Sequence, residues 1–197
     1  MPIVSGVPIT LITKDNLSDW VKPGFPIHPA YEYLSDVHKS DYLRAYFMHH
    51  YGGGYADIKQ PGGSWLPAFT KFAANPNIWV LGYNESGPAD IANIPDKVFY
   101  AKMTAIAEKL LGNGSYICRS GTQWTQAWID GVHTVLDKYH ANLRMNPAQS
   151  ARATNETQYG YPLAWTEICG HIFHPLCYKY LEHAEGGLPM PICSNYQ

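Results

Sequence analysis

Apolar residues recur with a helical period in the segment 31–51. Leu43, Phe47 and Tyr51 are spaced four apart, which places them on one face of a helix. Three glycines follow at 52–54, and glycine is both a poor helix former and a common residue at helix ends. The pattern therefore predicts a helix that stops at the glycines.

Short apolar runs elsewhere in the first half predict strands. The run 7–12 leads into the polar stretch 13–16, which is typical of a buried strand that ends in a loop. A second strand is expected at 55–58 and a third at 78–82, with a turn rich in proline and glycine at 60–64 between them.

The second half of the chain has more helical periodicity. Apolar residues keep a helical spacing over 98–110 and again over 124–136. A last mixed segment at 165–183 contains Pro175, which we expect to interrupt it. Strands that alternate with helices predict an α/β domain with a mostly parallel central sheet flanked by helices on both faces.

The composition fits one globular domain over residues 1–197. Hydrophobic residues make up 46% and charged residues 15% of the chain, which argues against disorder. The net charge of −2 argues against nucleic-acid binding, because that needs a basic patch. No apolar run reaches the roughly 18 residues of a membrane-spanning helix, so we expect no membrane span.

The cysteines do not form a C-x-x-C pair, which argues against a structural zinc site. In a chain of this size we expect reduced, mostly buried thiols and a cytoplasmic location. The cysteines are Cys118, Cys169, Cys177 and Cys193.

The stretch 38–59 combines polar side chains with the triple glycine. Ser40 and Asp41 lie four and three residues before Arg44, so all three share a helix face opposite the apolar stripe. Alone, such a pair is usually solvated and stabilises a helix by only a few tenths of a kcal/mol, about 0.3–0.5.

Asp57 changes that interpretation. Ligands bind open α/β sheets at the carboxyl ends of strands, where Asp15 and Asp57 would both lie. Glycines before Asp57 allow the backbone to approach a ligand closely. A carboxylate in that place suits a divalent cation that bridges a diphosphate, since Mg²⁺ and Mn²⁺ prefer oxygen ligands.

The motif resembles the S-D-x-x-R…Y-G-G-x-Y-x-D-x-D block of GT-A-fold glycosyltransferases, in particular the DXD sugar-binding and capsular-polysaccharide-synthesis group. The matching residues are Ser40, Asp41, Arg44, Tyr51, Gly52, Gly53, Tyr55 and Asp57. The resemblance implies a nucleotide-diphosphate sugar donor, with UDP-sugar favoured, and a carbohydrate acceptor. It also implies that the Asp/Arg helix face contacts the sugar and that Asp57 holds Mn²⁺ or Mg²⁺.

Weaker similarity to the same group extends into other segments. Ser120 and Gly121 resemble a loop near the donor sugar, although the family's proline is replaced by Thr122. The region of His171 and His174 corresponds to where such enzymes bring a C-terminal residue back to the metal.

Thr13 and Asp15 resemble the end of the first strand, which contacts uridine in this group. Asp15 and Asn16 equally suit an ordinary helix N-terminus.

Lys59 departs from the family pattern, which has a second aspartate there. On a strand, residues 57 and 59 point to the same side, so Lys59 would place a positive charge beside the metal. Either Asp57 binds the metal with His171 or His174, or Lys59 itself neutralises the diphosphate. We expect the first arrangement, since imidazole is an acceptable ligand for Mn²⁺.

Glycosyl transfer with inversion needs a carboxylate that deprotonates the acceptor hydroxyl, whereas transfer with retention does not. Candidate bases are Asp90, in the loop after the third strand, Glu85 and Glu167. Rival hypotheses are a sugar-nucleotide or glycan-binding module that has lost turnover, which Lys59 suggests, and a metal-dependent phosphohydrolase, which needs several clustered carboxylates or histidines.

Similar domains occur in bacterial capsule synthesis and in large DNA viruses of algae that glycosylate their capsids, where the location would be the host cytoplasm. Such a compact unit can also be an excerpt of a larger polypeptide.

Overall fold

A four-stranded mixed sheet lies at the centre of the molecule, with the strand order β1-β3-β2-β4. The computed structural model describes residues 2–192. β3 pairs antiparallel with both β1 and β2, whereas β2 and β4 run parallel. The expected mostly parallel sheet is therefore wrong, because β3 inserts between β1 and β2 and runs opposite to both. The strands are β1 (Gly53–Ala56), β2 (Val80–Asn84), β3 (Leu111–Cys118) and β4 (Ala184–Glu185).

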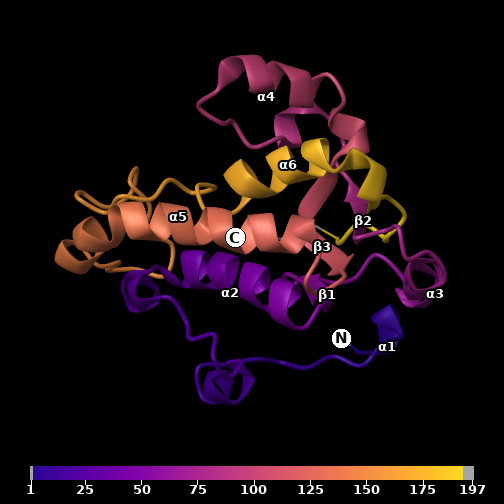
Figure 1. Cartoon of the computed structure of the whole chain (residues 1–197), viewed down its shortest axis with the longest axis horizontal. Helices are drawn as coiled ribbons and strands as arrows, with labels where there is room; N and C mark the ends of the chain where they lie inside the picture. Colours follow the sequence, from indigo (N-terminus) through magenta and orange to yellow (C-terminus); the bar gives the residue numbers. More distant parts are fainter. Residues whose placement is uncertain (1, 193–197) are drawn as a thin grey trace.

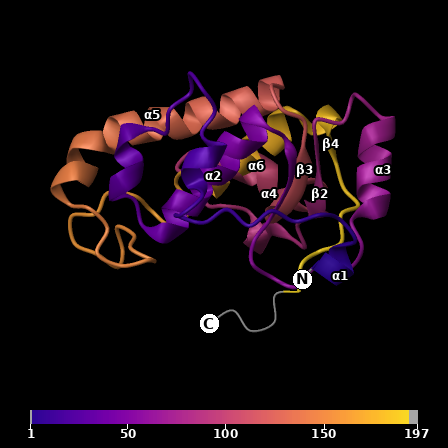
Figure 2. The same ribbon diagram turned by 90° about the horizontal axis from the view of Figure 1, so that it is seen from below.

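Helices cover both faces of this sheet, as expected. α5 lies between α2 and α6, and α6 packs against β3 (Figure 1). Figure 2 shows α3 at the opposite end of the molecule from the loops that follow α5. The α-helices are α1 (Pro2–Ser5), α2 (Asp36–His50), α3 (Leu66–Ala74), α4 (Lys97–Thr104), α5 (Gln123–Met145) and α6 (Gly170–Lys179). The 3-10 helices are η1 (Leu17–Trp20), η2 (Pro29–Tyr33), η3 (Pro88–Asp90), η4 (Ala107–Lys109) and η5 (Leu181–His183).

The core divides along the alternating faces of β3. Tyr116 faces the aromatic rings of Trp128 and Phe173, which come from α5 and α6. Ile117 points to the other face, where it belongs to a smaller apolar cluster with residues of α3 such as Phe72. This alternation explains why helices are needed on both sides.

The sequence pattern did not predict β3, although it is one of the two inner strands of the sheet. Gly112 and Gly114 interrupt its apolar run, and glycine normally weakens a strand. In the structure both glycines have neighbours that need the space: a Cβ at Gly112 would collide with the ring of Tyr83, and the Tyr83 hydroxyl accepts a hydrogen bond from the Gly114 N–H at 3.3 Å. The glycines therefore mark close packing within the sheet.

The predicted helix over 31–51 forms as two pieces, η2 and α2. Ser35 caps α2 by accepting a hydrogen bond from the His38 N–H at 3.3 Å. The expected apolar stripe of Leu43 and Phe47 is only half-buried. Instead Tyr42 and Tyr46 are buried, and so are the polar Asp41 and Arg44. The helix thus turns its charged face inward, contrary to a solvated pair.

The segment 7–12 does not form the expected strand and has no regular structure. Pro8 lacks the N–H that a strand ladder needs, and Ile9 and Leu11 are exposed. In Figure 1 this indigo segment runs from α1 past α2 to η1. Asp15 consequently does not follow a strand.

Most other expected elements are present, with shifted ends. β1 and β2 correspond to the strands expected at 55–58 and 78–82, and α5 contains the helix expected at 124–136. The helix expected at 98–110 divides into α4 and η4. α6 continues through Pro175.

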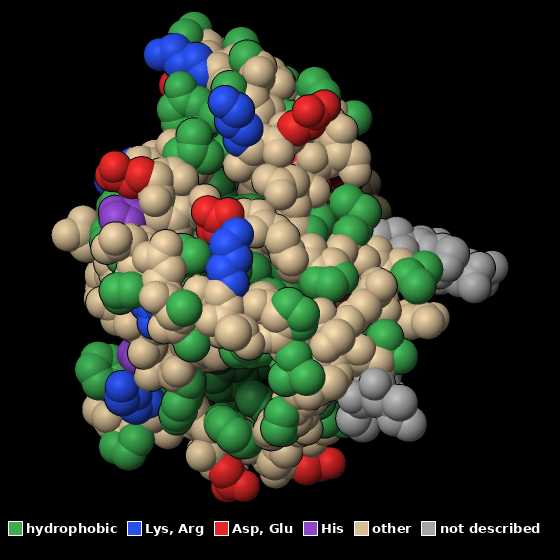
Figure 3. All heavy atoms as spheres, turned by 90° about the vertical axis from the view of Figure 1, so that its right-hand side faces the viewer, with side chains coloured by type: hydrophobic (Ala, Val, Ile, Leu, Met, Phe, Trp, Pro, Cys, Tyr) green, Lys and Arg blue, Asp and Glu red, His purple; other side chains and the backbone are tan. Residues whose placement is uncertain are grey.

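Cys118, Cys169 and Cys177 are free and buried, whereas Cys193 lies outside the described residues. No helix within residues 2–192 has the length and apolar character needed to span a bilayer. Figure 3 shows one side of the molecule, on which hydrophobic side chains gather around a hollow in the lower half.

Gly52 provides a test of the turn between α2 and β1. Its φ of +68° is unfavourable for other residues, and a Cβ would lie 2.8 Å from the Cys118 carbonyl oxygen. We expect Gly52→Ala to lower the free energy of unfolding by about 2 kcal/mol in urea denaturation. Gly87→Ala is the control, because no atom lies within 4 Å of a Cβ there. Equal stability of the two variants would contradict this account of the turn.

Two histidines whose pKa is lowered in the folded chain, the buried His38 and the half-buried His50, predict a loss of stability in mild acid. Burial lowers the pKa of His38 below 6.5, and burial also lowers the pKa of His50, to about 4. Between about pH 6.5 and pH 4, these two histidines bind more protons in the unfolded chain than in the folded one. Their contribution to the stability of the fold therefore falls as the pH decreases. We expect the Tm to fall from pH 7 to pH 5, measured by circular dichroism at constant ionic strength. A Tm that rises over this range would contradict the prediction.

Candidate functional site

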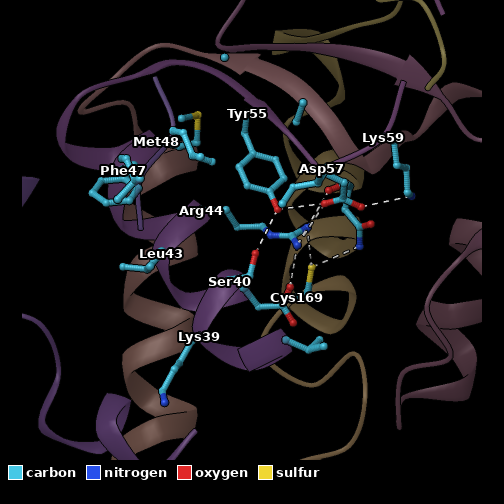
Figure 4. A pocket seen from close by; sticks show the side chains of 18 of the residues that line it. Lys39, Ser40, Leu43, Arg44, Phe47, Met48, Tyr55, Asp57, Lys59 and Cys169 are labelled. Carbon is cyan, nitrogen blue, oxygen red and sulfur yellow. Dashed lines mark hydrogen bonds and ion pairs between the residues drawn. The ribbon is translucent and has the colours of Figure 1, made fainter. Parts of the chain in front are cut away.

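A pocket of about 1730 Å³ lies between the N-terminal segment, α2 and the end of β1. One side of it is apolar and includes Leu43, Phe47 and Met48 of α2 (Figure 4). The other side is polar and includes Arg44 and Asp57 (Figure 4). Two consecutive turns of one helix therefore supply both an apolar and a charged wall.

Arg44 is the centre of the polar side and is only 7% exposed. Its Nη2 lies 3.0 Å from Asp41 Oδ1 and 3.4 Å from Asp57 Oδ1. Its Nη1 donates to the carbonyl oxygen of Asn113 at 2.8 Å. The guanidinium also lies over the Tyr55 ring, 4.5 Å from the ring centroid. Arg44 thus joins α2, β1 and β3 to one another.

Asp57 follows β1 directly and accepts from donors on both carboxylate oxygens. The Tyr55 hydroxyl donates to Oδ1 at 2.9 Å, the oxygen that Arg44 also contacts. Lys59 Nζ lies 3.2 Å from Oδ2. Ser40 extends this network, because its hydroxyl lies 3.2 Å from that of Tyr55. The structure therefore brings together the predicted residues of helix and strand, with Lys59 among them.

The charges at this site balance one another. Although burial disfavours its charge, neighbouring groups, Cys169 first and then Tyr55 and Asp41, raise the pKa of Arg44 well above its usual value. Burial raises the pKa of Tyr55, which remains a hydroxyl donor to Asp57. Two cations, Arg44 and Lys59, thus face two carboxylates, those of Asp41 and Asp57.

Cys169 and Asn113 belong to the site but were not among the predicted residues. The Asn113 side-chain amide donates to the Cys169 sulfur at 3.3 Å, and Arg44 Nη1 lies 3.6 Å from the same sulfur. Burial raises the pKa of the Cys169 thiol well above 9.0, so it is uncharged. The sequence predicted only a buried thiol at Cys169. Asn113 was missed because it lies on β3, a strand that the sequence pattern did not predict.

The predicted metal ligands are not assembled. His174 Nδ1 accepts from the Ala92 N–H at 2.9 Å, so its Nε2 carries the hydrogen and donates to Glu85 Oε1 at 3.1 Å. Both ring nitrogens are therefore engaged within the protein. Within residues 2–192, no three His, Cys, Asp or Glu side chains lie close enough to hold a metal ion, and Asp57, His171 and His174 do not form such a group.

Thr13 lines the pocket, but Asp15 is not among the described lining residues. Asn16 Oδ1 accepts from the Thr13 N–H at 2.7 Å, and the Thr13 hydroxyl accepts from the Asp15 N–H at 3.3 Å. These two hydrogen bonds close the turn that precedes η1. Asn16 is the N-cap residue of η1, but its side chain makes no capping hydrogen bond to the helix.

The predicted catalytic acids differ in their positions. Asp90 is exposed, lines the pocket and accepts from the Ser86 N–H at 3.1 Å. Glu167 accepts from the Ala164 N–H at 2.9 Å and is not among the described lining residues. Glu85 is paired with His174. Among the three, Asp90 is the acid that reaches the pocket.

Ser120 and Gly121 precede α5 and are not among the described residues that line the large pocket. The Gly121 N–H donates to the His49 carbonyl oxygen at 3.0 Å, so this loop packs against the end of α2. Gly121 lines a separate hollow of about 380 Å³ with Thr122. Gly53 is exposed at the start of β1 with a φ of +82°.

No protein-family model matches this chain, and no curated protein or solved structure is significantly similar to it.

Replacing Arg44 tests its role as the buried link. In Arg44→Met the carboxylates of Asp41 and Asp57 lose their shared cation, and we expect a loss of about 3–5 kcal/mol in urea denaturation. Burial already raises the pKa of Asp41, so the uncompensated acid should bind a proton when folded, and the loss should be larger at pH 8 than at pH 5.

Arg152→Met is the matched control, because Arg152 is an exposed arginine of the same pocket. It should change the free energy of unfolding by no more than about 0.5 kcal/mol. Asp41→Asn added to Arg44→Met should recover part of the loss. A loss in Arg44→Met no greater than in the control would show that the buried network does not stabilise the fold.

Proposed function

We propose that this chain is a GT-A-like catalytic domain that transfers a sugar from a nucleotide-diphosphate donor, with UDP-sugar favoured, to a glycan acceptor. The observation that carries the proposal is the convergence of Ser40, Arg44, Asp57 and Lys59 on one pocket wall, from a helix, a strand end and the following loop. These residues lie in the segment that resembles glycosyltransferases, and a pocket is where the resemblance requires them.

The dimensions and lining of the pocket support a substrate of two parts. Its volume of about 1730 Å³ exceeds the ~300–1,000 Å³ that is usual for a single small-molecule site. Aromatic residues that line the pocket, Phe47, Trp65 and Trp165 among them, offer flat surfaces to a base or a sugar ring. The charged wall suits the phosphates.

In the proposed reaction, the bond between the anomeric carbon and the diphosphate oxygen breaks, and a bond to the acceptor oxygen forms. Negative charge grows on the leaving nucleoside diphosphate, and Arg44 and Lys59 are the cations of this wall that can offset it. If the anomeric configuration inverts, the acceptor proton passes to a carboxylate. Asp90 is the candidate because it lines the pocket.

The resemblance also implies Mn²⁺ or Mg²⁺, and the residues present do not fit that ion well. Both oxygens of Asp57 already face donors, and both ring nitrogens of His174 have partners. In the proposed reaction the protein's own cations, Arg44 and Lys59, therefore offset the charge of the leaving group.

A second candidate function is a module that binds sugar nucleotides or glycans without turnover. The balanced ion pairs of Arg44 and Lys59 favour it, because a site neutralised by its own carboxylates holds a charged transition state less strongly than one with surplus positive charge.

A donor and acceptor screen separates these functions. We expect UDP-sugars to raise the Tm more than the other nucleotide sugars, by mass action on the folded state. With a glycan acceptor, UDP release should accompany a new glycosidic product, detected by mass spectrometry. Arg44→Lys should lower transfer, since lysine cannot keep the planar contacts to Asp41, Asp57 and Asn113. Arg152→Lys is the control.

Binding of the donor without product across a broad acceptor panel would favour the binding module. Hydrolysis of the UDP-sugar, with no glycosidic product formed whichever acceptor is added, would favour a hydrolase. A chain that binds no nucleotide sugar at all would overturn the proposal.

A further inference from the structure

We infer that Lys59 and Arg44 bind the donor diphosphate in place of a divalent metal, an inference that rests on the proposed function. Asp57 is then a positioning residue that holds the Lys59 ammonium toward the pocket. The class of ligand is a nucleoside diphosphate bound without metal. Asp57 then has a different role from the metal ligand that the resemblance implies, and Lys59, which departs from the family pattern, binds the phosphate.

Lys59 is held inside the site. Its side chain is only 15% exposed, it lines the pocket, and its Nζ lies 3.2 Å from Asp57 Oδ2. In Figure 4, Lys59 and Arg44 approach the Asp57 carboxylate from opposite sides. A lysine whose only role was solubility would extend into water, because its ammonium is strongly hydrated and its chain flexible.

β3 leaves room for this ion pair. A Cβ at Gly114 would lie 3.6 Å from Asp57 Oδ2 and 3.7 Å from Lys59 Nζ, in van der Waals contact with both, so Gly114 lies directly against the ion pair. The Gly114 carbonyl oxygen also accepts from the Asp57 N–H at 2.8 Å, which fixes the backbone where β1 ends. The pair is therefore built into the sheet by its neighbouring strand.

The same arrangement opposes a divalent cation. A metal on Asp57 Oδ2 would have to displace the Lys59 ammonium and then remain beside it, and like charges at that distance repel. On Oδ1 it would meet the Arg44 guanidinium, which stays charged because its pKa is raised. A diphosphate has the opposite charge and benefits from both cations. An ammonium has three N–H donors, so a phosphate contact does not require Lys59 to leave Asp57.

The test measures binding of UDP to the full chain by calorimetry, after dialysis against EDTA and again with Mn²⁺. We expect equal Kd values in the two conditions, within about twofold. Lys59→Gln should weaken UDP binding in EDTA by about tenfold or more, the effect of one charge-assisted hydrogen bond. Its uridine affinity should not change, because uridine has no phosphate. Lys59→Arg should restore most of the UDP affinity.

Two further variants make the result specific. Lys39→Gln removes the same charge from the same pocket, but Lys39 points away from Asp57 (Figure 4), and it should leave the UDP Kd within about twofold. Asp57→Asn keeps the shape but releases the ammonium, so Lys59→Gln should weaken UDP binding in EDTA less in an Asp57→Asn background than in the wild type, and Mn²⁺ should still not be required. Circular dichroism confirms that each variant is folded.

The outcomes are distinguishable. UDP binding that appears only with Mn²⁺, or a Lys59→Gln variant with unchanged affinity in EDTA, would overturn this inference and leave the proposed function intact. Absence of UDP and UDP-sugar binding in both conditions would remove the proposed function and the inference with it.

Discussion

The site and much of the fold depend on one buried guanidinium. Arg44 reaches from α2 to Asp57 at the end of β1 and to the Asn113 carbonyl oxygen on β3. A buried charge is tolerated only when ion pairs and hydrogen bonds replace its hydration. Arg44 meets that condition through its two Nη atoms, which have partners from three elements, whereas its buried Nε has no hydrogen-bond partner among the described residues. The position of α2 against the sheet and the shape of the pocket wall are therefore linked.

Aromatic packing holds the Tyr55 ring in place against Arg44. Tyr55 stacks on Tyr116, with ring centroids 5.4 Å apart, and Tyr116 in turn contacts Phe173 of α6. The Tyr55 ring therefore presents one face to the core and lies beneath Arg44 with the other, while its hydroxyl donates to Asp57. A pocket wall anchored this way needs little rearrangement on binding, which favours precise placement of the charges.

Two features of this site could be predicted from the sequence: the shared helix face and the end of the helix. The spacing of Asp41 and Arg44 predicted a shared helix face, and the triple glycine predicted the end of the helix before a short strand. That the pair is buried was not predictable, because a helical Asp–Arg pair is usually solvated and nothing local indicates that α2 is covered on its polar side. Asp57 lies at the end of a strand as predicted, directly after β1, whereas Asp15 follows no strand.

The sequence by itself determined the local elements: the α2 helix, its stop at the glycines, and the carboxylate and lysine that follow β1. Only the tertiary structure decided that β3 would run antiparallel between β1 and β2, and that Asn113 and Cys169 would meet Arg44. The reason is physical. Periodicity and capping act within a few residues, whereas strand pairing and the partners of a buried charge depend on contacts between residues far apart in the chain.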